Sequence, residues 1–131
     1  MSKILGPYQE RIYAVMRFVV GFLLAFHGFQ KLFGAFGREA SPLFSQAGLG
    51  GVIELFGGIL VAIGLFGSWA AFLCSGTMAV AYFQFHQPGG LWPIVNKGEL
   101  AVVYCWIFLY IAAHGSGKWS VASFLKKPAW S

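Results

Sequence analysis

The sequence predicts an all-α integral membrane protein, folded as a bundle of four transmembrane helices. Its 131 residues are 58% hydrophobic and only 10% charged, whereas soluble domains are about 45–50% apolar and about 25% charged. A chain this short is mostly surface, so a soluble fold would leave much of its apolar content facing water. Four apolar segments each approach the roughly 20 helical residues that are needed to cross a bilayer. We therefore expect lipid to cover the apolar surface.

The four predicted spans are residues 14–34, 49–66, 69–86 and 96–114, all within a single domain over residues 1–131. Residues 35–47 are expected to form the first loop, and Gly67–Ser68 a tight turn between the second and third spans. The stretch QPGGLWP (87–93) separates the third span from the fourth, because proline and glycine do not continue a helix. The run GSGK (115–118) ends the fourth span.

The distribution of basic residues predicts the orientation in the membrane. Six of them flank the termini and the 67–68 turn, namely Lys3, Arg11, Arg17, Lys118, Lys126 and Lys127. Three belong to the other two loops and their flanks, namely Lys31, Arg38 and Lys97. The positive-inside rule therefore favours a protein of the cell (inner) membrane with both termini in the cytoplasm.

The net charge of +5 is interpreted as contact with anionic lipid headgroups. Nucleic-acid binding is not expected, because the basic residues form no dense stripe along one segment. The tryptophans near the predicted span ends are interpreted as interfacial anchors of the bilayer. They are Trp69, Trp92, Trp119 and Trp130.

Ionisable and amide side chains recur near the predicted outer ends of all four spans. The candidate ligand-binding or proton-handling residues are His27, Lys31, Glu54, His86, Asn96 and Glu99. Such groups are costly inside a membrane and need partners, so they are expected to meet at one level. No metal site and no intrinsic cofactor are predicted, because no ligand motif of known spacing is present.

Small residues predict which helix faces touch. At 100° per residue, Arg17, Gly21, Gly28 and Lys31 share one face of the first span. On the second span, Gly50, Glu54, Gly58 and Ala62 follow one another at intervals of four, and such spacing lets a neighbouring helix approach closely. Glu54 is therefore expected to face protein.

Glu54 has two interpretations, which the sequence leaves open. It could form a buried ion pair with Lys31 or Arg17 that sets the helix register. It could instead handle protons or anchor a ligand beside His27. Arg17 is expected to extend to the cytoplasmic headgroups, and Lys97 is interpreted as an ordinary interfacial residue.

Four motifs in order resemble the DoxX family of small four-helix membrane proteins, over roughly residues 12–125. They are R-x3-G-x6-G-x2-K from Arg17, E-x3-G-x5-G from Glu54, P-x2-N-x-G-E from Pro93, and G-x-G-x2-S from Gly115. Two positions depart from the family pattern: Lys97 stands where N-G-G-E has glycine, and Ala122 stands where the last motif has aspartate.

The resemblance implies a redox-associated membrane subunit, because related proteins are membrane subunits of thiosulfate:quinone oxidoreductase. The first hypothesis is accordingly a subunit that binds a quinone or a similar apolar ligand between its helices, with protein partners in a membrane complex. On this hypothesis the chain is at most a membrane subunit of a quinone-linked oxidoreductase. The alternative hypothesis is a structural or assembly subunit of a larger complex, with no ligand of its own.

Overall fold

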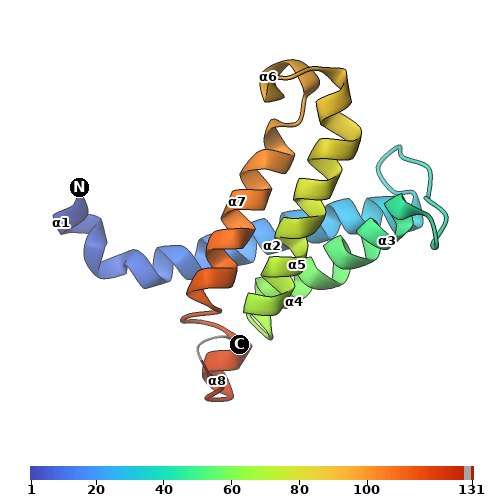
Figure 1. Ribbon diagram of the computed structural model, residues 1–131. Coiled ribbons are helices and arrows are strands. Elements are labelled where there is room, and N and C mark those ends of the chain that lie inside the picture. The colour runs from blue at the N-terminus through green and yellow to red at the C-terminus, as the bar shows by residue number, and fades with distance from the viewer. Residues whose placement is uncertain (129–130) are drawn as a thin grey trace.

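The computed structural model describes residues 1–128 and 131, which form helices joined by short loops. Two helical hairpins cross each other (Figure 1). The first hairpin consists of α1 (Ser2–Leu5), η1 (Gly6–Tyr8) and α2 (Gln9–Phe33), followed by α3 (Gln46–Val52), η2 (Ile53–Gly57) and α4 (Gly58–Ile63). The second consists of α5 (Gly67–Ala81), η3 (Tyr82–His86), η4 (Gln87–Gly89), α6 (Pro93–Asn96) and α7 (Glu99–His114), and α8 (Val121–Phe124) follows it.

Helical structure occupies each of the four segments that the sequence marks as apolar. Helix α2 packs along the continuous run α3–η2–α4, and α5 packs along α7. The two hairpins meet where α5 contacts η2 and α4. Their shared core contains fully buried side chains from α2, α4, α5 and α7, among them Leu24, Val61, Cys74 and Phe108.

Glycines bring α2 and the second helical run into backbone contact. A Cβ atom on Gly21 would lie 2.6 Å from the Gly58 carbonyl oxygen, and one on Gly28 would lie 2.5 Å from that of Gly51. The predicted glycine face of α2 is therefore confirmed. Gly50 does not belong to this contact, because a Cβ atom there would meet only the Thr77 side chain at 3.9 Å.

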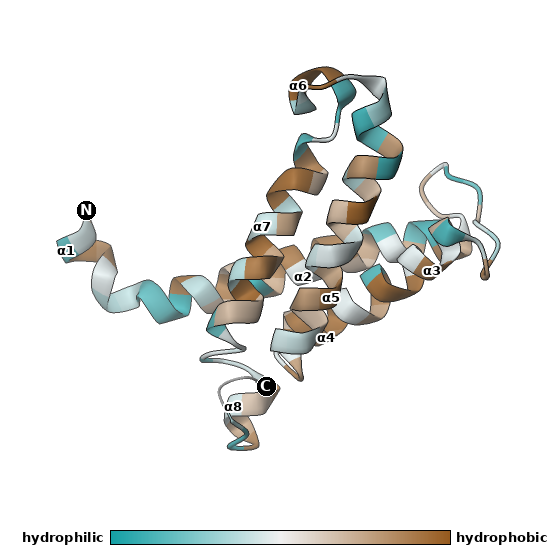
Figure 2. Cartoon of the chain, viewed as in Figure 1, coloured by the Kyte–Doolittle hydropathy of each residue, from teal (hydrophilic) through white to brown (hydrophobic). Residues whose placement is uncertain are grey.

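Hydrophobic residues occupy much of the long helices (Figure 2), and many of their side chains are exposed. Phe18, Phe22, Phe26 and Phe29 are all exposed along α2. Within the described residues, Ser2–Phe33 and Gln46–Ile63 are long and apolar enough to cross a membrane, and Glu99–His114 is a shorter apolar helix. This surface has the character of a membrane protein.

The tryptophans interpreted as membrane anchors are on the surface where they are described. Trp69, Trp92 and Trp119 are each about two-thirds exposed, at 64%, 66% and 65%. Trp130 lies outside the described residues.

The turn between α4 and α5 lies earlier in the chain than predicted. Gly67 begins α5, and Ser68 is already helical. The chain reverses at Gly64 and Phe66 instead, which both adopt left-handed φ angles of +70° and +50°. At Gly64 this backbone favours glycine, and a Cβ there would also lie 2.3 Å from the Cβ of Ser120. The prediction of a turn at Gly67–Ser68 is thus wrong by three residues.

Arg17 is buried, with 1% of its surface exposed, so the prediction that it extends to the headgroups is wrong. Its Nη1 donates to the carbonyl oxygens of Val61 and Ala62, each at 2.7 Å. Its Nη2 donates to the carbonyl oxygen of Trp119 at 2.9 Å. The guanidinium therefore supplies donors to two carbonyls at the end of α4, of which that of Val61 also accepts from the Gly64 backbone at 3.1 Å.

We expect Arg17→Met to destabilise the protein strongly. Methionine retains much of the apolar stem, but it removes the Arg17 donor from the Ala62 carbonyl oxygen and one of two donors from that of Val61, and a buried acceptor without a donor costs about 1–3 kcal/mol. Arg11→Met is the matched control, because Arg11 lies on the same helix and is exposed. Thermal melting of the detergent-purified variants should show a large loss for Arg17→Met and little change for Arg11→Met. Equal melting of the two variants would contradict the capping role.

Candidate functional site

A groove of about 730 Å³ lies between the helical run α3–η2 and the helical run α5–η3. Ligand sites in proteins commonly have volumes of about 300–1,000 Å³. Its apolar walls include Leu49 and Ile53 on one side and Phe72, Leu73, Val80 and Phe85 on the other. Lys31, Glu54 and His86, three of the six predicted site residues, also line this groove.

Both π-helical segments among the described residues border the groove. The segment Ile53–Gly57 contains Glu54, and the segment Tyr82–His86 contains His86. Such segments insert an extra residue into a helical turn and are frequent at functional sites. Here they place an acidic group and an imidazole on opposite walls of one groove.

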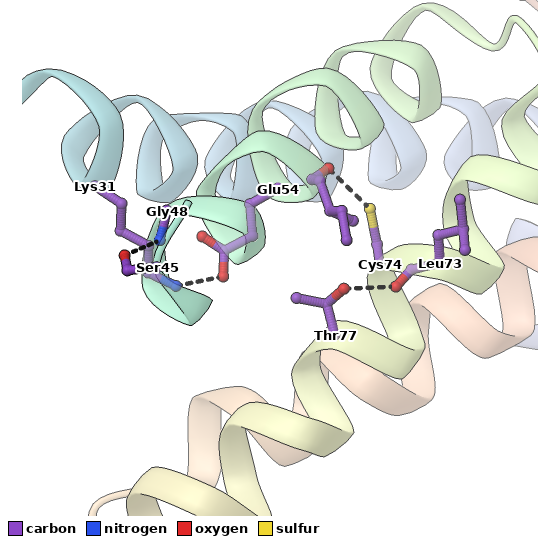
Figure 3. Close-up of polar contacts among 8 residues, drawn as sticks. Lys31, Ser45, Gly48, Glu54, Leu73, Cys74 and Thr77 are labelled. Carbon is purple, nitrogen blue, oxygen red and sulfur yellow. Dashed lines mark hydrogen bonds and ion pairs between the residues drawn. The ribbon is translucent and has the colours of Figure 1, made fainter. Parts of the chain in front are cut away.

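Glu54 and Lys31 form an ion pair with 2.6 Å between Lys31 Nζ and Glu54 Oε1. The Glu54 side chain is 1% exposed and that of Lys31 is 20% exposed. The two groups face each other from η2 and α2, whereas Thr77 and Cys74 come from α5 (Figure 3). Of the two alternative partners for Glu54, the structure selects Lys31, and Arg17 binds backbone carbonyls instead.

The ion pair depends on local helix packing. Gly51 lets α3 approach α2 directly beside Lys31, because a Cβ at Gly51 would lie 3.1 Å from the Cβ of Lys31. Ser45 caps α3 by accepting a hydrogen bond from the Gly48 backbone at 3.1 Å. The cap fixes the start of the helical run that carries Glu54.

Asn96 lies beside His86 and organises the loop that precedes α7. Its side-chain oxygen accepts from the Gly98 backbone at 2.8 Å, and its nitrogen donates to the Gly90 carbonyl at 2.9 Å. The His86 Nδ1 atom is 3.3 Å from the Asn96 carbonyl oxygen. Asn96 therefore supports the position of His86 from outside the groove lining.

Lys97 occupies a loop position whose backbone conformation favours glycine, the residue that the N-G-G-E pattern has there. It adopts a left-handed backbone with φ +60° and ψ +24°. This conformation costs a residue with a Cβ about 1–2 kcal/mol relative to glycine. The position is thus set by backbone geometry, and the Lys97 side chain is exposed.

His27 and Glu99 are not among the groove residues. His27 is exposed on α2, with its ring centroid 6.2 Å from that of Tyr104 on α7. Glu99 is exposed at the first turn of α7. Three of the predicted residues are therefore brought together, and His27 and Glu99 lie apart from them.

Arg38, Gln46 and Thr77 also line the groove, although the sequence did not predict them as site residues. Gln46 and Gln84 are hydrogen-bonded through their side chains, from α3 to η3. For Thr77 a sequence signal exists, because Leu73, Gly76, Thr77 and Val80 share one helical face in which small and polar residues interrupt the apolar run. Arg38 belongs to the 34–45 loop, for which no periodicity applies.

A second hollow, of about 470 Å³, lies near the start of α5. Ser68, Trp69, Phe72 and Ala112 line it. Its walls carry no ionisable side chain, so it offers fewer means of orienting a ligand than the first groove. Among the described residues, no group of three or more His, Cys, Asp or Glu side chains could hold a metal ion.

Comparison with known proteins identifies the family of this chain. The family model described as DoxX matches residues 12–87, a range that contains Lys31, Glu54 and His86. The chain belongs to the DoxX family. The match thus covers both walls of the groove and ends before Asn96 and Glu99.

A relative from Haemophilus influenzae is 37% identical over 134 residues, which cover 94% of this chain and 98% of the relative. It is described only as an uncharacterized protein. No solved structure matches the chain. Family membership therefore supports a membrane-associated subunit, and it identifies no ligand.

We expect Glu54→Gln to lower the yield and melting temperature of the folded protein. Removing one member of a buried ion pair leaves the other charge without compensation, which typically costs about 3–5 kcal/mol. The partial exposure of Lys31 places the effect toward the lower end of that range. Glu39→Gln is the control, because Glu39 is exposed in the loop. The buried-pair interpretation fails if size-exclusion and melting profiles of the two variants are the same.

Proposed function

We propose that this protein is an integral membrane subunit that binds a quinone, or an apolar ligand of similar shape, in the groove between α3–η2 and α5–η3. The observation that carries the proposal is an ion pair in a groove whose walls are mostly apolar. A quinone needs an apolar slot for its ring and tail and a hydrogen-bond donor near a carbonyl oxygen. Lys31 has three donor hydrogens and donates one of them to Glu54.

The groove opens onto the apolar surface, which supports entry of the ligand from lipid. Leu49, Phe72 and Phe85 line the groove and are also exposed, at 51%, 57% and 62%. An apolar tail could therefore extend along these side chains while the ring reaches Lys31. His86 on the opposite wall could donate to the second carbonyl from Nε2 when its imidazole carries both protons, because the Asn96 carbonyl oxygen beside Nδ1 takes the other N–H.

We further propose that four helices cross the cell membrane and that both termini lie in the cytoplasm. Arg17 and Lys31 are each held by internal partners, so the remaining basic residues decide the orientation. Five of these lie at the termini, namely Lys3, Arg11, Lys118, Lys126 and Lys127, and two lie in the other loops, namely Arg38 and Lys97. This bias favours cytoplasmic termini.

In this proposal the chain is the quinone-binding membrane subunit of an oxidoreductase complex, and a protein partner delivers the electrons. The second candidate function is an assembly subunit without a ligand. The ion pair itself favours that function, because a buried pair can set the register of α2 against η2 without binding any ligand. Ligand binding distinguishes the two functions.

We expect a short-chain quinone to raise the melting temperature of the detergent-purified protein. A ligand that binds only the folded state adds RT ln(1 + [L]/Kd) to its stability. His86→Ala should weaken quinone affinity roughly three- to tenfold, because one hydrogen bond to a neutral partner is lost. His27→Ala is the matched control and should leave the quinone response unchanged. A wild-type protein that shows no shift at saturating quinone is the assembly subunit.

A further inference from the structure

One oxygen of the Glu54 carboxylate has no hydrogen-bond partner. Oε1 accepts from Lys31 at 2.6 Å, whereas the buried Oε2 atom has none among the described residues. Buried polar atoms are nearly always paired, so an unpaired one marks a place where a partner is expected. As the partner of the Lys31 ammonium group, the carboxylate accepts hydrogen bonds and donates none.

The neighbouring donors on α5 are committed elsewhere. The Cys74 thiol lies 3.8 Å from the Ile53 carbonyl oxygen and donates to it. The Thr77 hydroxyl donates to the Leu73 carbonyl oxygen at 2.9 Å. Figure 3 shows both contacts, and neither reaches the carboxylate. Glu54 lines the groove, and its buried Oε2 atom is an acceptor that the described side chains leave unused.

We propose that Glu54 makes the groove selective for a ligand that carries a hydroxyl donor on an apolar body, which in the quinone class is the reduced quinol. This inference rests on the proposed function. A quinol has O–H groups where the oxidised quinone has only carbonyl acceptors. The quinol hydroxyl donates to Glu54 Oε2, and its oxygen accepts one of the remaining Lys31 hydrogens.

The selectivity follows from the charge on the acceptor. A hydrogen bond to an ionised group is roughly twice as strong as one between neutral groups. A ligand without a donor would leave Oε2 unpaired and would bring its own oxygen lone pairs toward a negative charge. Glu54 is therefore a specificity-determining residue of the groove, in addition to its structural pairing with Lys31.

The test compares two redox-stable probes of nearly equal shape, 4-heptylphenol and 1-fluoro-4-heptylbenzene. Dissociation constants for the purified protein are measured by quenching of tryptophan fluorescence, with free concentrations corrected for partition into detergent micelles. The wild type and Glu39→Gln should bind the phenol at least about tenfold more tightly. In Glu54→Gln this ratio should fall below about threefold, because a neutral amide is a weaker acceptor. Should that variant not fold, the double variant Lys31→Met/Glu54→Leu carries the comparison, with a ratio near one.

The outcomes separate the two proposals. Equal binding of both probes to the wild type overturns the donor selectivity while the ligand-binding function stands. A phenol preference that survives the Glu54 substitutions also overturns it, because another group then recognises the hydroxyl. If neither probe nor a short-chain quinone binds the wild type, the proposed function fails and the selectivity with it.

Discussion

The ion pair between Lys31 and Glu54 is the interaction on which the account of this protein depends. It joins α2 to η2 inside an apolar protein, where a lone carboxylate would be costly. The pair can form only because Gly28 and Gly51 bring the two helices into backbone contact. Among the described residues, the same carboxylate is the only acidic group that lines the groove. Packing and ligand recognition therefore converge on one side chain.

A second buried cation on the same face of α2 acts in a different way. Arg17 binds the carbonyls that end α4, whereas Lys31 binds a carboxylate in the middle of the same helical run. The Arg17 contact also reaches the Trp119 carbonyl, which ties the segment after α7 to the first hairpin. Helix α2 is thus fixed to its neighbour at two points, with the glycine contacts between them. A rigid frame of this kind can hold a groove open beside it.

The helical segments and the buried state of Glu54 could be predicted from the sequence, because both follow from length, apolar runs and helical periodicity. The placement of the site could be predicted only in part. The π-helical segments at Ile53–Gly57 and Tyr82–His86 shift the faces that an ideal helix would present. Gly50 therefore faces the groove and not α2. Regular periodicity likewise could not exclude His27, which lies toward Tyr104 on α7.

Arg17 shows a different limit of sequence reasoning. Its position near a helix start fits a side chain that reaches the headgroups, and its partners are backbone carbonyls 44 or more residues away. Backbone acceptors carry no residue signature, so no pattern reveals them. Gly64 does carry a trace of this contact, since its left-handed φ and the nearby guanidinium both require the absence of a side chain.

The most direct test of the central claim is a double-variant comparison at Lys31 and Glu54. Lys31→Met and Glu54→Leu should each lower the melting temperature, and the combined variant should recover most of the loss, because an apolar pair can replace a buried ion pair. The recovered double variant should no longer be stabilised by a short-chain quinone. A double variant that loses the sum of the two single effects, or that folds and still binds quinone as the wild type does, would contradict the claim that this pair both holds the helices and recognises the ligand.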